Sequence, residues 1–541
     1  MGTSAHGGLA IIDWVIVCVY ASSTIGLGYY FSRKQRNTTE YFVGSGAMSP
    51  ILVGVSLFAT LLSTISYLSM PGETISKGPV ATVANLCAYP LAYLFVSRVL
   101  LGIYMSQRVT SAYELLEEKL GLGIRLLGAV LFILMRLVWM SLLVYIAAKA
   151  MTVMLGVGDE WIPLVVLVTG FVSVIYTSLG GLGAVVITDF LQFSLLFGGA
   201  WVVIGLVTHE LGGFSWFPTT WQPTWDTQPL FSIDPRVRIT VFGTILSGTL
   251  WHICTAGGDQ VSIQRFMATK DARSAKRAFL TQMCVGTCVA ATLVLVGFAL
   301  LGYFQQRPHE LPANLGLVTN GDQIFPHFVS FHLPPGVTGL VVSAMFAAAM
   351  SSIDSGVNSI TAVIMTDFMD RFGLKPRTEK SHVRWAQIMA LTVGAAVVVG
   401  SSFIGQVPGN FTAMTQRTTN LLVTPVFGLF FFAMFIPFAR AAGVLVGTIY
   451  GVTTAILIAF SGSFYEVIAA GTGLETTAIS FQWISPTALM ANIGAGTLTC
   501  WFIRPQDSKQ WVLIKMIICL IPLLALMGLI LGYPWISRIP V

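Results

Sequence analysis

The chain has 541 residues, of which 55% are hydrophobic and only 10% are charged. A soluble protein of this length needs more polar side chains to cover its surface, so the composition excludes a soluble globular fold. Apolar runs of roughly 20 residues recur along the whole chain, which is the length that a helix needs to cross a hydrocarbon core about 30 Å thick. The sequence therefore predicts an all-α polytopic membrane protein. Its net charge of +6 lies in short connections between apolar runs, which argues against a nucleic-acid-binding surface.

Fourteen apolar segments follow one another as candidate transmembrane helices. In chain order they cover residues 10–31, 49–69, 80–104, 123–153, 161–178, 184–208, 239–261, 279–304, 336–366, 383–405, 412–437, 441–461, 485–503 and 511–533. No soluble domain fits between them, and no GxxxxGK[ST] phosphate loop occurs, so an ATP-driven pump or other enzyme is not expected. The seven cysteines lie in apolar runs without metal-ligand spacing and are expected to be free thiols.

Lysine and arginine predict the orientation of these segments. If fourteen spans alternate, the basic connections near residues 33–36, 265–277, 371–384 and 504–509 all lie on one side. Positive charge marks that side as the cytoplasm, and it includes Arg265. We therefore expect a multi-pass protein of the plasma or inner membrane with both termini outside the cytoplasm.

An unusually polar stretch, AAAMSSIDSGVNS at residues 347–359, lies inside the ninth apolar run. Helical periodicity places Ala348, Ser351, Ser352 and Ser355 on one face, with Asp354 at its edge. A hard monovalent cation such as sodium binds several oxygen ligands with little total charge, and this face offers them. Small residues and serines also let helices pack closely, but an ionised carboxylate has no use in such a packing face.

Two further stretches carry polar groups at membrane depth. The stretch at residues 54–72 contains the hydroxyls of Ser63, Thr64, Ser66 and Ser69 within one span. They would allow the helix to break and expose carbonyl oxygens; an intact helix is the alternative. The stretch SLGGLGAVVITDFLQ, residues 178–192, starts the sixth span with a glycine-rich turn and carries Asp189. That carboxylate would either bind a cation or only interact with the helix dipole.

These stretches resemble the solute:sodium symporter family in the motifs YTSLGGLGAVVITDFLQ, GGDQVSIQRFMATKDARSAKRA and AAAMSSIDSGVNS. The resemblance covers roughly the first 460 residues. It implies one transporter domain over residues 1–541 with a LeuT-type fold, a monomeric transport unit, and sodium as coupling ion. The implied parts are an extra helix at 10–31, inverted repeats at 49–208 and 239–437, and added C-terminal helices at 441–533.

The resemblance also implies the ion sites. The principal sodium site would use carbonyls at Ala59, Leu62 and Ala348 with the hydroxyls of Ser351 and Ser352. Some members have a second sodium site, which here would contain Asp189, Asp354 and Ser355, together with Ser351. The family pattern has serine at 354, so the aspartate would either strengthen this site or admit a proton.

For the substrate, the resemblance implies a pocket lined by Ser63, Ser66, Asn85 and His252. Thr255 stands where sugar carriers have an aromatic residue, which disfavours a simple hexose. Arg136 resembles an arginine that holds the carboxylate in sialic acid carriers, and the alternative is a structural pairing with Asp189, Asp354 or backbone carbonyls.

The expected function is thus sodium-driven import of a small solute across the lipid bilayer, most simply one with a carboxylate, such as a sialic acid, a monocarboxylate or an amino acid. The alternatives are a sugar or polyol symporter and a sensor or channel with the same fold. His252 fits a hydrogen-bonded residue of the helix bundle better than a proton carrier.

Overall fold

The computed structural model describes residues 9–536 except positions 34–37, 45, 63, 108, 156, 224, 228, 405–410, 463, 465–477 and 505. All regular structure in this described part is helical. By its internal packing the chain divides into two compact units. The first unit contains Met1–Thr110, Arg136–Thr227 and Gln264–Thr415, and the second contains Ser111–Met135, Gln228–Ile263 and Gln416–Val541.

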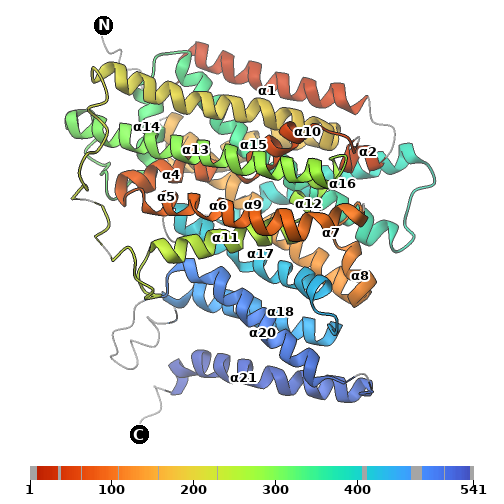
Figure 1. The fold of residues 1–541 in the computed structure, drawn as a ribbon. Coiled ribbons are helices and arrows are strands. Elements are labelled where there is room, and N and C mark those ends of the chain that lie inside the picture. The colour runs from red at the N-terminus through yellow and green to blue at the C-terminus, as the bar shows by residue number, and fades with distance from the viewer. Residues whose placement is uncertain are drawn as a thin grey trace. The chain divides into compact units, whose positions relative to one another are not determined.

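The helices of the first unit run along one another (Figure 1). They are α1 (Ile11–Ser32), α2 (Thr38–Val43), α3 (Pro50–Leu61), α4 (Thr64–Ser76), α5 (Val80–Leu86), α6 (Ala88–Phe95), the π-helix η1 (Val96–Leu100), α7 (Leu101–Gln107), η2 (Asp159–Trp161), α10 (Ile162–Glu210), α13 (Ala272–Gln306), η3 (Pro308–Glu310), α14 (Gly321–Phe331), α15 (Val337–Val363), the π-helix η4 (Ile364–Asp370) and α16 (Glu379–Ile404).

The second unit holds α8 (Glu114–Leu120), α11 (Val241–Gly258), α18 (Ala441–Ala459), η5 (Phe481–Trp483), α20 (Ile484–Phe502) and α21 (Lys509–Ile536). Three helices have residues in both units: α9 (Leu122–Leu155), α12 (Gln260–Met267) and α17 (Phe411–Phe435).

Two interruptions in the first unit occur where the sequence predicted them. Between α3 and α4 the chain bends by 61°, and Leu62 is extended with φ −79° and ψ 105°. Within α10, Gly181 has φ 59° and ψ −173°, which joins two helical segments at a kink. A side chain would be strained in that conformation, so glycine is required at this turn.

The described residues contain eight helices long and apolar enough to cross a bilayer, or nine if α3 and α4 form one bent span. The multi-span character predicted from composition is thereby confirmed. The number fourteen stays a prediction. In this count α10 belongs to a single element of 52 residues, although a helix of about 20 residues already spans the hydrocarbon core.

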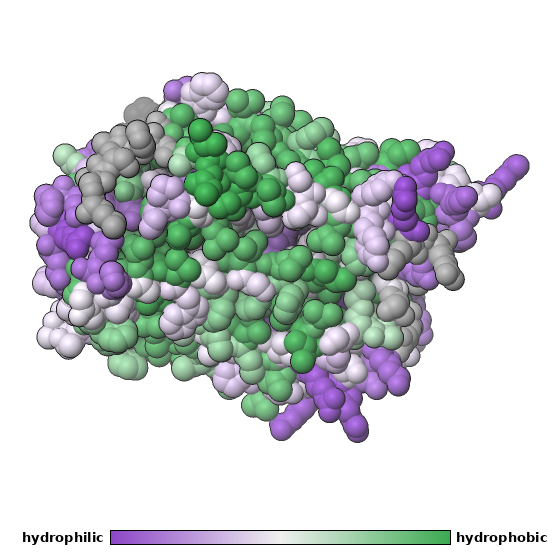
Figure 2. All heavy atoms as spheres, turned by 90° about the horizontal axis from the view of Figure 1, so that it is seen from above, coloured by the Kyte–Doolittle hydropathy of each residue, from purple (hydrophilic) through white to green (hydrophobic). Residues whose placement is uncertain are grey.

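The surface of the protein also fits a lipid environment. Figure 2 shows a face that is hydrophobic over most of its area, with hydrophilic side chains gathered at its two ends. Large apolar side chains such as Phe171 and Phe403 are exposed on the protein surface. In water such a surface would aggregate, whereas in a bilayer it is solvated by acyl chains.

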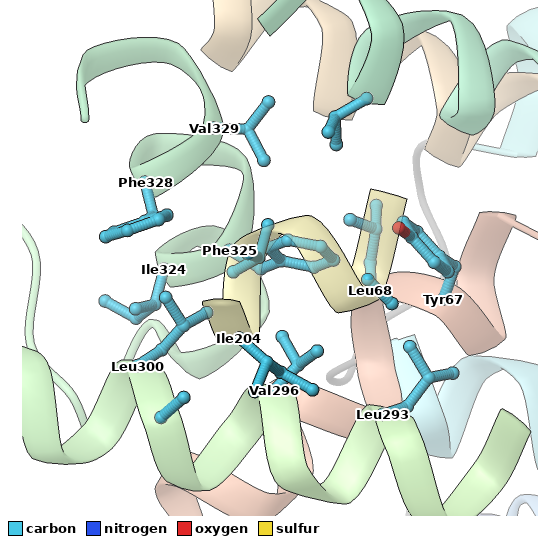
Figure 3. Close-up of a cluster of buried hydrophobic side chains, with 14 of the residues drawn as sticks. Tyr67, Leu68, Ile204, Leu293, Val296, Leu300, Ile324, Phe325, Phe328 and Val329 are labelled. Atoms are coloured by element: carbon cyan, nitrogen blue, oxygen red, sulfur yellow. The ribbon is translucent and has the colours of Figure 1, made fainter. Parts of the chain in front are cut away.

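The main core of the first unit lies where α4, α10, α13 and α14 meet. Figure 3 shows Phe325 and Phe328 of α14 among side chains of α13, with Tyr67 and Leu68 of α4 beside them. Tyr67, Leu68, Phe325 and Phe328 are fully buried. The helix α14 therefore acts as an apolar cover on α4, the segment that follows the break.

The helix α1 is tied to the start of α15 by one carboxylate. Asp13 is buried, and its Oδ1 accepts hydrogen bonds from the backbone amides of Gly336 and Gly339, each at 2.7 Å. An anion at a helix N-terminus satisfies amides that lack an intrahelical partner and interacts favourably with the helix dipole. The helix α1 thus helps to position α15.

In the second unit α18 and α20 pack through small residues. A Cβ atom built on Gly447 would lie 2.5 Å from the Asn492 carbonyl oxygen, and one on Gly451 would lie 2.9 Å from the Asn492 Cβ. The glycines at 443, 447 and 451 share one helix face. This arrangement is the small-residue packing by which membrane helices approach closely.

Candidate functional site

The break after α3 lies beside the middle of α15, and hydroxyl groups join the two. Ser352 donates to the Thr60 carbonyl oxygen at 3.0 Å, and the hydroxyls of Thr60 and Ser355 are 2.8 Å apart. Thr64, the first residue of α4, donates to the Met345 carbonyl oxygen at 3.2 Å. A non-helical stretch of backbone and an oxygen-lined helix face are thereby held together inside the first unit.

All residues predicted for the principal sodium site lie at this junction. Ala59 and Leu62 belong to the end of α3, and Ala348, Ser351 and Ser352 lie on the facing part of α15. All five are buried. Because Leu62 is extended, α3 ends there, and carbonyl oxygens at such a break can face a cation.

Asp189 of α10 contacts the same face of α15 through Ser351 and is fully buried. Ser56 of α3 donates to one carboxylate oxygen at 2.5 Å, and Ser351 donates to the other at 2.5 Å. The guanidinium of Arg265 donates to Asp189 Oδ2 at 3.2 Å. Asp189 is therefore part of a buried ion pair and cannot be interpreted only as an anion near a helix N-terminus.

The prediction that Arg265 lies in a water-facing connection is wrong. Arg265 was expected among the basic residues of a cytoplasmic connection, but it belongs to α12 and its side chain is 0% exposed. It also donates to Ser56 at 2.8 Å and to Ser355. Burial of an arginine is tolerated only when a counter-charge and acceptors surround it, as they do here. The sequence signal for this burial was Asp189, because an aspartate in an apolar span needs a cation nearby.

Asp354 occupies a different environment from Asp189. Its Oδ1 accepts a hydrogen bond from Thr177 of α10, and its Oδ2 is buried with no hydrogen-bond partner among the described residues. The sequence grouped Asp189, Asp354 and Ser355 in one site. In the structure Asp189 and Ser355 share Arg265, whereas Asp354 bonds to Thr177.

The residues predicted to bind substrate lie on several helices. Ser63 is outside the described residues. Ser66 of α4 and Asn85 of α5 are half-buried, and Arg136 of α9 is buried. His252 of α11 belongs to the second unit, where its ring lies edge-on to Trp251 at 4.8 Å between centroids.

The hydrogen bonds of Asp189 and Asp354 come from Arg265, Thr177 and serines. Within the described part of the chain, no group of three His, Cys, Asp or Glu side chains is placed to hold a metal ion. The junction instead offers mainly the neutral oxygens of hydroxyl and carbonyl groups, which suit an alkali cation.

Comparison with known proteins identifies the fold and the family. The model of the sodium:solute symporter family matches residues 41–451, about three quarters of the chain. The chain belongs to this family. The family consists of transporters, not enzymes, and the protein is a sodium-coupled solute symporter embedded in the membrane as a multi-pass helical protein.

Curated members of the sodium:solute symporter family align over most of the chain. The sodium/sialic acid symporter SiaT of Proteus mirabilis is 28% identical over 485 residues, which is 85% of this chain and 92% of the relative. The human sodium-coupled monocarboxylate transporter 1 is 27% identical over 474 residues, covering 85% and 75% respectively. The human sodium/iodide cotransporter is 26% identical over 460 residues, covering 82% and 68%.

Solved structures show the same architecture. A Na+-coupled sialic acid symporter in a substrate-bound outward-open state superposes with a TM-score of 0.74 and 25% sequence identity, covering 92% of this chain and 99% of that chain. The nucleobase-cation transporter Mhp1 reaches a TM-score of 0.53 at 11% identity, covering 87% and 96%. The symporter therefore has the LeuT-like helical fold that its motifs implied.

Proposed function

We propose that this symporter imports a small organic solute carrying a carboxylate, of the class of sialic acids, monocarboxylates or amino acids. The observation that carries the proposal is Arg136, an arginine buried in α9 of the first unit. Its guanidinium offers two parallel N–H donors, which match a carboxylate. Relatives named for sialic acid and for monocarboxylates align over 85% of the chain or more, which supports a carboxylate-bearing substrate over a sugar or polyol.

The principal sodium ion would bind at the break between α3 and α4. Its ligands would be carbonyl oxygens of Ala59, Leu62 and Ala348 and the hydroxyls of Ser351 and Ser352. The hydrogen bonds between α3 and α15 support this proposal because they hold these groups in one place. A sodium ion that replaces its hydration shell needs five or six such oxygens.

The arrangement in the membrane would follow the repeats that the sequence predicts. Residues 49–208 and 239–437 would form the inverted repeats, preceded by the helix at 10–31 and followed by helices within 441–533, giving fourteen spans with both termini outside the cytoplasm. The kink at Gly181 supports this count because it divides α10 into two segments. The transport unit would be a monomer working by alternating access.

A panel of labelled carboxylates, sugars and polyols, offered to proteoliposomes with and without an inward sodium gradient, tests this function. We expect at least tenfold accumulation of one carboxylate class only when sodium is present outside. Arg136→Ala should weaken the apparent affinity for that solute by about tenfold to a hundredfold, the loss of a bidentate ion pair of roughly 1.5–3 kcal/mol.

Arg136→Lys is the matched control, because it keeps the charge but removes the two-pronged geometry, and an intermediate affinity is expected. Uptake of a sugar in preference to every carboxylate, or unchanged affinity in Arg136→Ala, would contradict the proposed substrate class. Sodium-independent accumulation would contradict the proposed coupling.

A further inference from the structure

The helix α1 lies at the edge of the first unit, against α10 and α15 (Figure 1). Every residue of α1 belongs to the described part of the chain, and only Asp13, Thr24 and Gly28 among them are buried. The Thr24 hydroxyl donates to a carbonyl oxygen of α1 itself. Asp13 lies near one end of α1 and Gly28 near the other, and each is in close contact with a neighbouring helix.

Asp13 attaches α1 to the N-terminus of α15. Its Oδ1 accepts hydrogen bonds from the backbone amides of Gly336 and Gly339 at 2.7 Å each, and its Oδ2 accepts one from the amide of Ala10 at 2.9 Å. The two backbones also meet, because a Cβ atom built on Gly339 would lie 2.5 Å from the Asp13 Cα. The start of α15 therefore cannot slide along α1 without breaking two charge-assisted hydrogen bonds.

Gly28 attaches α1 to α10 next to the kink. A Cβ atom built on Gly28 would lie 2.7 Å from the Tyr176 carbonyl oxygen and 3.1 Å from the Tyr176 Cα. A Cβ atom built on Gly180 would lie 3.4 Å from the Gly28 Cα, and the next residue, Gly181, is the kink itself. Because a side chain at Gly28 would meet the backbone of α10, the separation of the two helices at the kink depends on this glycine.

The two attachments lie about 22 Å apart along α1, at 1.5 Å per residue. Between them α10 and α15 bond directly to each other, since Thr177 of α10 donates to α15 and Ser351 of α15 donates to α10. From its start to beyond Ser351 and Ser352, α15 is one continuous helix. A shift of its first turn is therefore transmitted to these two serines.

We propose that Asp13 and Gly28 are positioning residues for the principal sodium site. By holding the start of α15 and the kink of α10 at a fixed separation, α1 sets where Ser351 and Ser352 lie beside the break after α3. This inference rests on the proposed sodium site and goes beyond it, because α1 itself supplies no ligand. Ligands must be held within about 0.5 Å of the binding geometry, so loss of either attachment lowers the sodium affinity without removing the site.

The test is equilibrium binding of radioactive sodium to the purified full-length protein, with thermal unfolding of the same samples to measure folding. Asp13→Ala removes the attachment to α15, and Gly28→Ala pushes α1 away from α10. Each should raise the dissociation constant for sodium about threefold to tenfold, as residues without ligand contact can do. Asp13→Asn keeps an oxygen for the two amides of α15 and should lie close to wild type.

Gly26→Ala is the matched control, because a Cβ atom built on Gly26 of the same helix meets nothing within 4 Å. This variant should bind sodium as the wild type does, and an equal loss of affinity in it would overturn the inference. Wild-type affinity in both Asp13→Ala and Gly28→Ala would overturn it too, even with lowered unfolding temperatures, because α1 would then only support the fold. Gly28→Ala decides alone where Asp13→Ala does not unfold cooperatively. A wild-type protein that binds no sodium would instead overturn the proposed function.

Discussion

At the scale of single residues, the buried pair of Asp189 and Arg265 joins α10 to α12 and, through the hydroxyls of Ser56 and Ser355, also contacts α3 and α15. Both side chains are 0% exposed and lie 3.2 Å apart, and Ser56 and Ser355 complete the hydrogen bonds around them. The attraction between two buried charges roughly balances the cost of removing them from water, so the intact pair adds little net stability. Loss of one member, however, leaves the other charge buried alone.

We therefore expect Arg265→Gln to lower the free energy of unfolding by about 3–5 kcal/mol, measured by denaturant titration in mixed micelles. The double variant Arg265→Gln with Asp189→Asn should recover a large part of that loss, because no charge then remains uncompensated. Additive losses in the double variant would show that the two residues do not act as a pair.

At the scale of elements, α14 covers α4 next to a cavity of about 810 Å3 that contains several ionisable side chains. Arg307 donates to Glu210 at 2.8 Å and lies 3.5 Å from Glu310, and His332 Nδ1 lies 3.3 Å from Glu310. His327 lies beside His332 with 5.6 Å between ring centroids. The Nε2 atoms of both histidines are buried without a hydrogen-bond partner among the described residues.

Burial and, to a smaller extent, the neighbouring His332 together lower the pKa of His327 to about 4. The pKa of His332 is also lowered by burial, although Glu310 and Glu210 oppose that shift. Unfolded histidine has a pKa of about 6.5, so between about pH 6.5 and 4 the unfolded segment binds protons that the packed α14 excludes. The packing of α14 must therefore become less stable as the pH falls through this window. At pH values below the window, His327 causes no further loss of stability.

Acidification should accordingly lower the melting temperature of the wild-type protein more than that of His327→Gln between pH 7 and 4.5. The glutamine cannot be protonated, so the difference between the two curves isolates this side chain. The neighbouring acidic groups Glu210 and Glu310, with Arg307, Tyr303 and His309 around the cavity, are common to both proteins. Parallel curves over the whole pH range would contradict the assignment of a depressed pKa to packed His327.

At the scale of the whole molecule, coupling links sodium entry to solute entry. One positive charge moving inward contributes about 2.3 kcal/mol per 100 mV, and a second ion doubles that contribution. Ion binding needs only to favour the conformation that binds the solute for this energy to drive accumulation. A channel or sensor of the same fold would lack this dependence on two gradients.

In reconstituted membranes we expect a substrate-dependent current whose reversal potential shifts with both the sodium and the solute gradient. With two ions per cycle, a tenfold change in sodium should shift it twice as far as a tenfold change in solute, whatever charge the solute carries. A current whose reversal potential depends only on the sodium gradient would indicate a channel. Equal shifts for the two gradients would indicate one ion per cycle.

Properties that depend on a few neighbouring residues could be predicted from the sequence, whereas properties that depend on contacts between distant segments could not. The helical membrane character, the break near Leu62 and the kink in the SLGGLGA stretch depend on composition and backbone preferences within a few residues, so they were predictable. The motifs likewise indicated the family. Arg265 was misplaced because charge alone predicts a water-facing connection, and only its partner explains its burial.

The separation of the two carboxylates was decided by the tertiary structure alone. Asp189 meets Arg265 across 76 residues of chain, and Asp354 meets Thr177 across 177. Along the sequence, Asp354 lies three residues from Ser351, which bonds to Asp189, and the family resemblance implied one site shared by both acids. Which acid obtains a counter-charge depends on how α10, α12 and α15 pack, and neither hydropathy nor periodicity encodes contacts between segments so far apart.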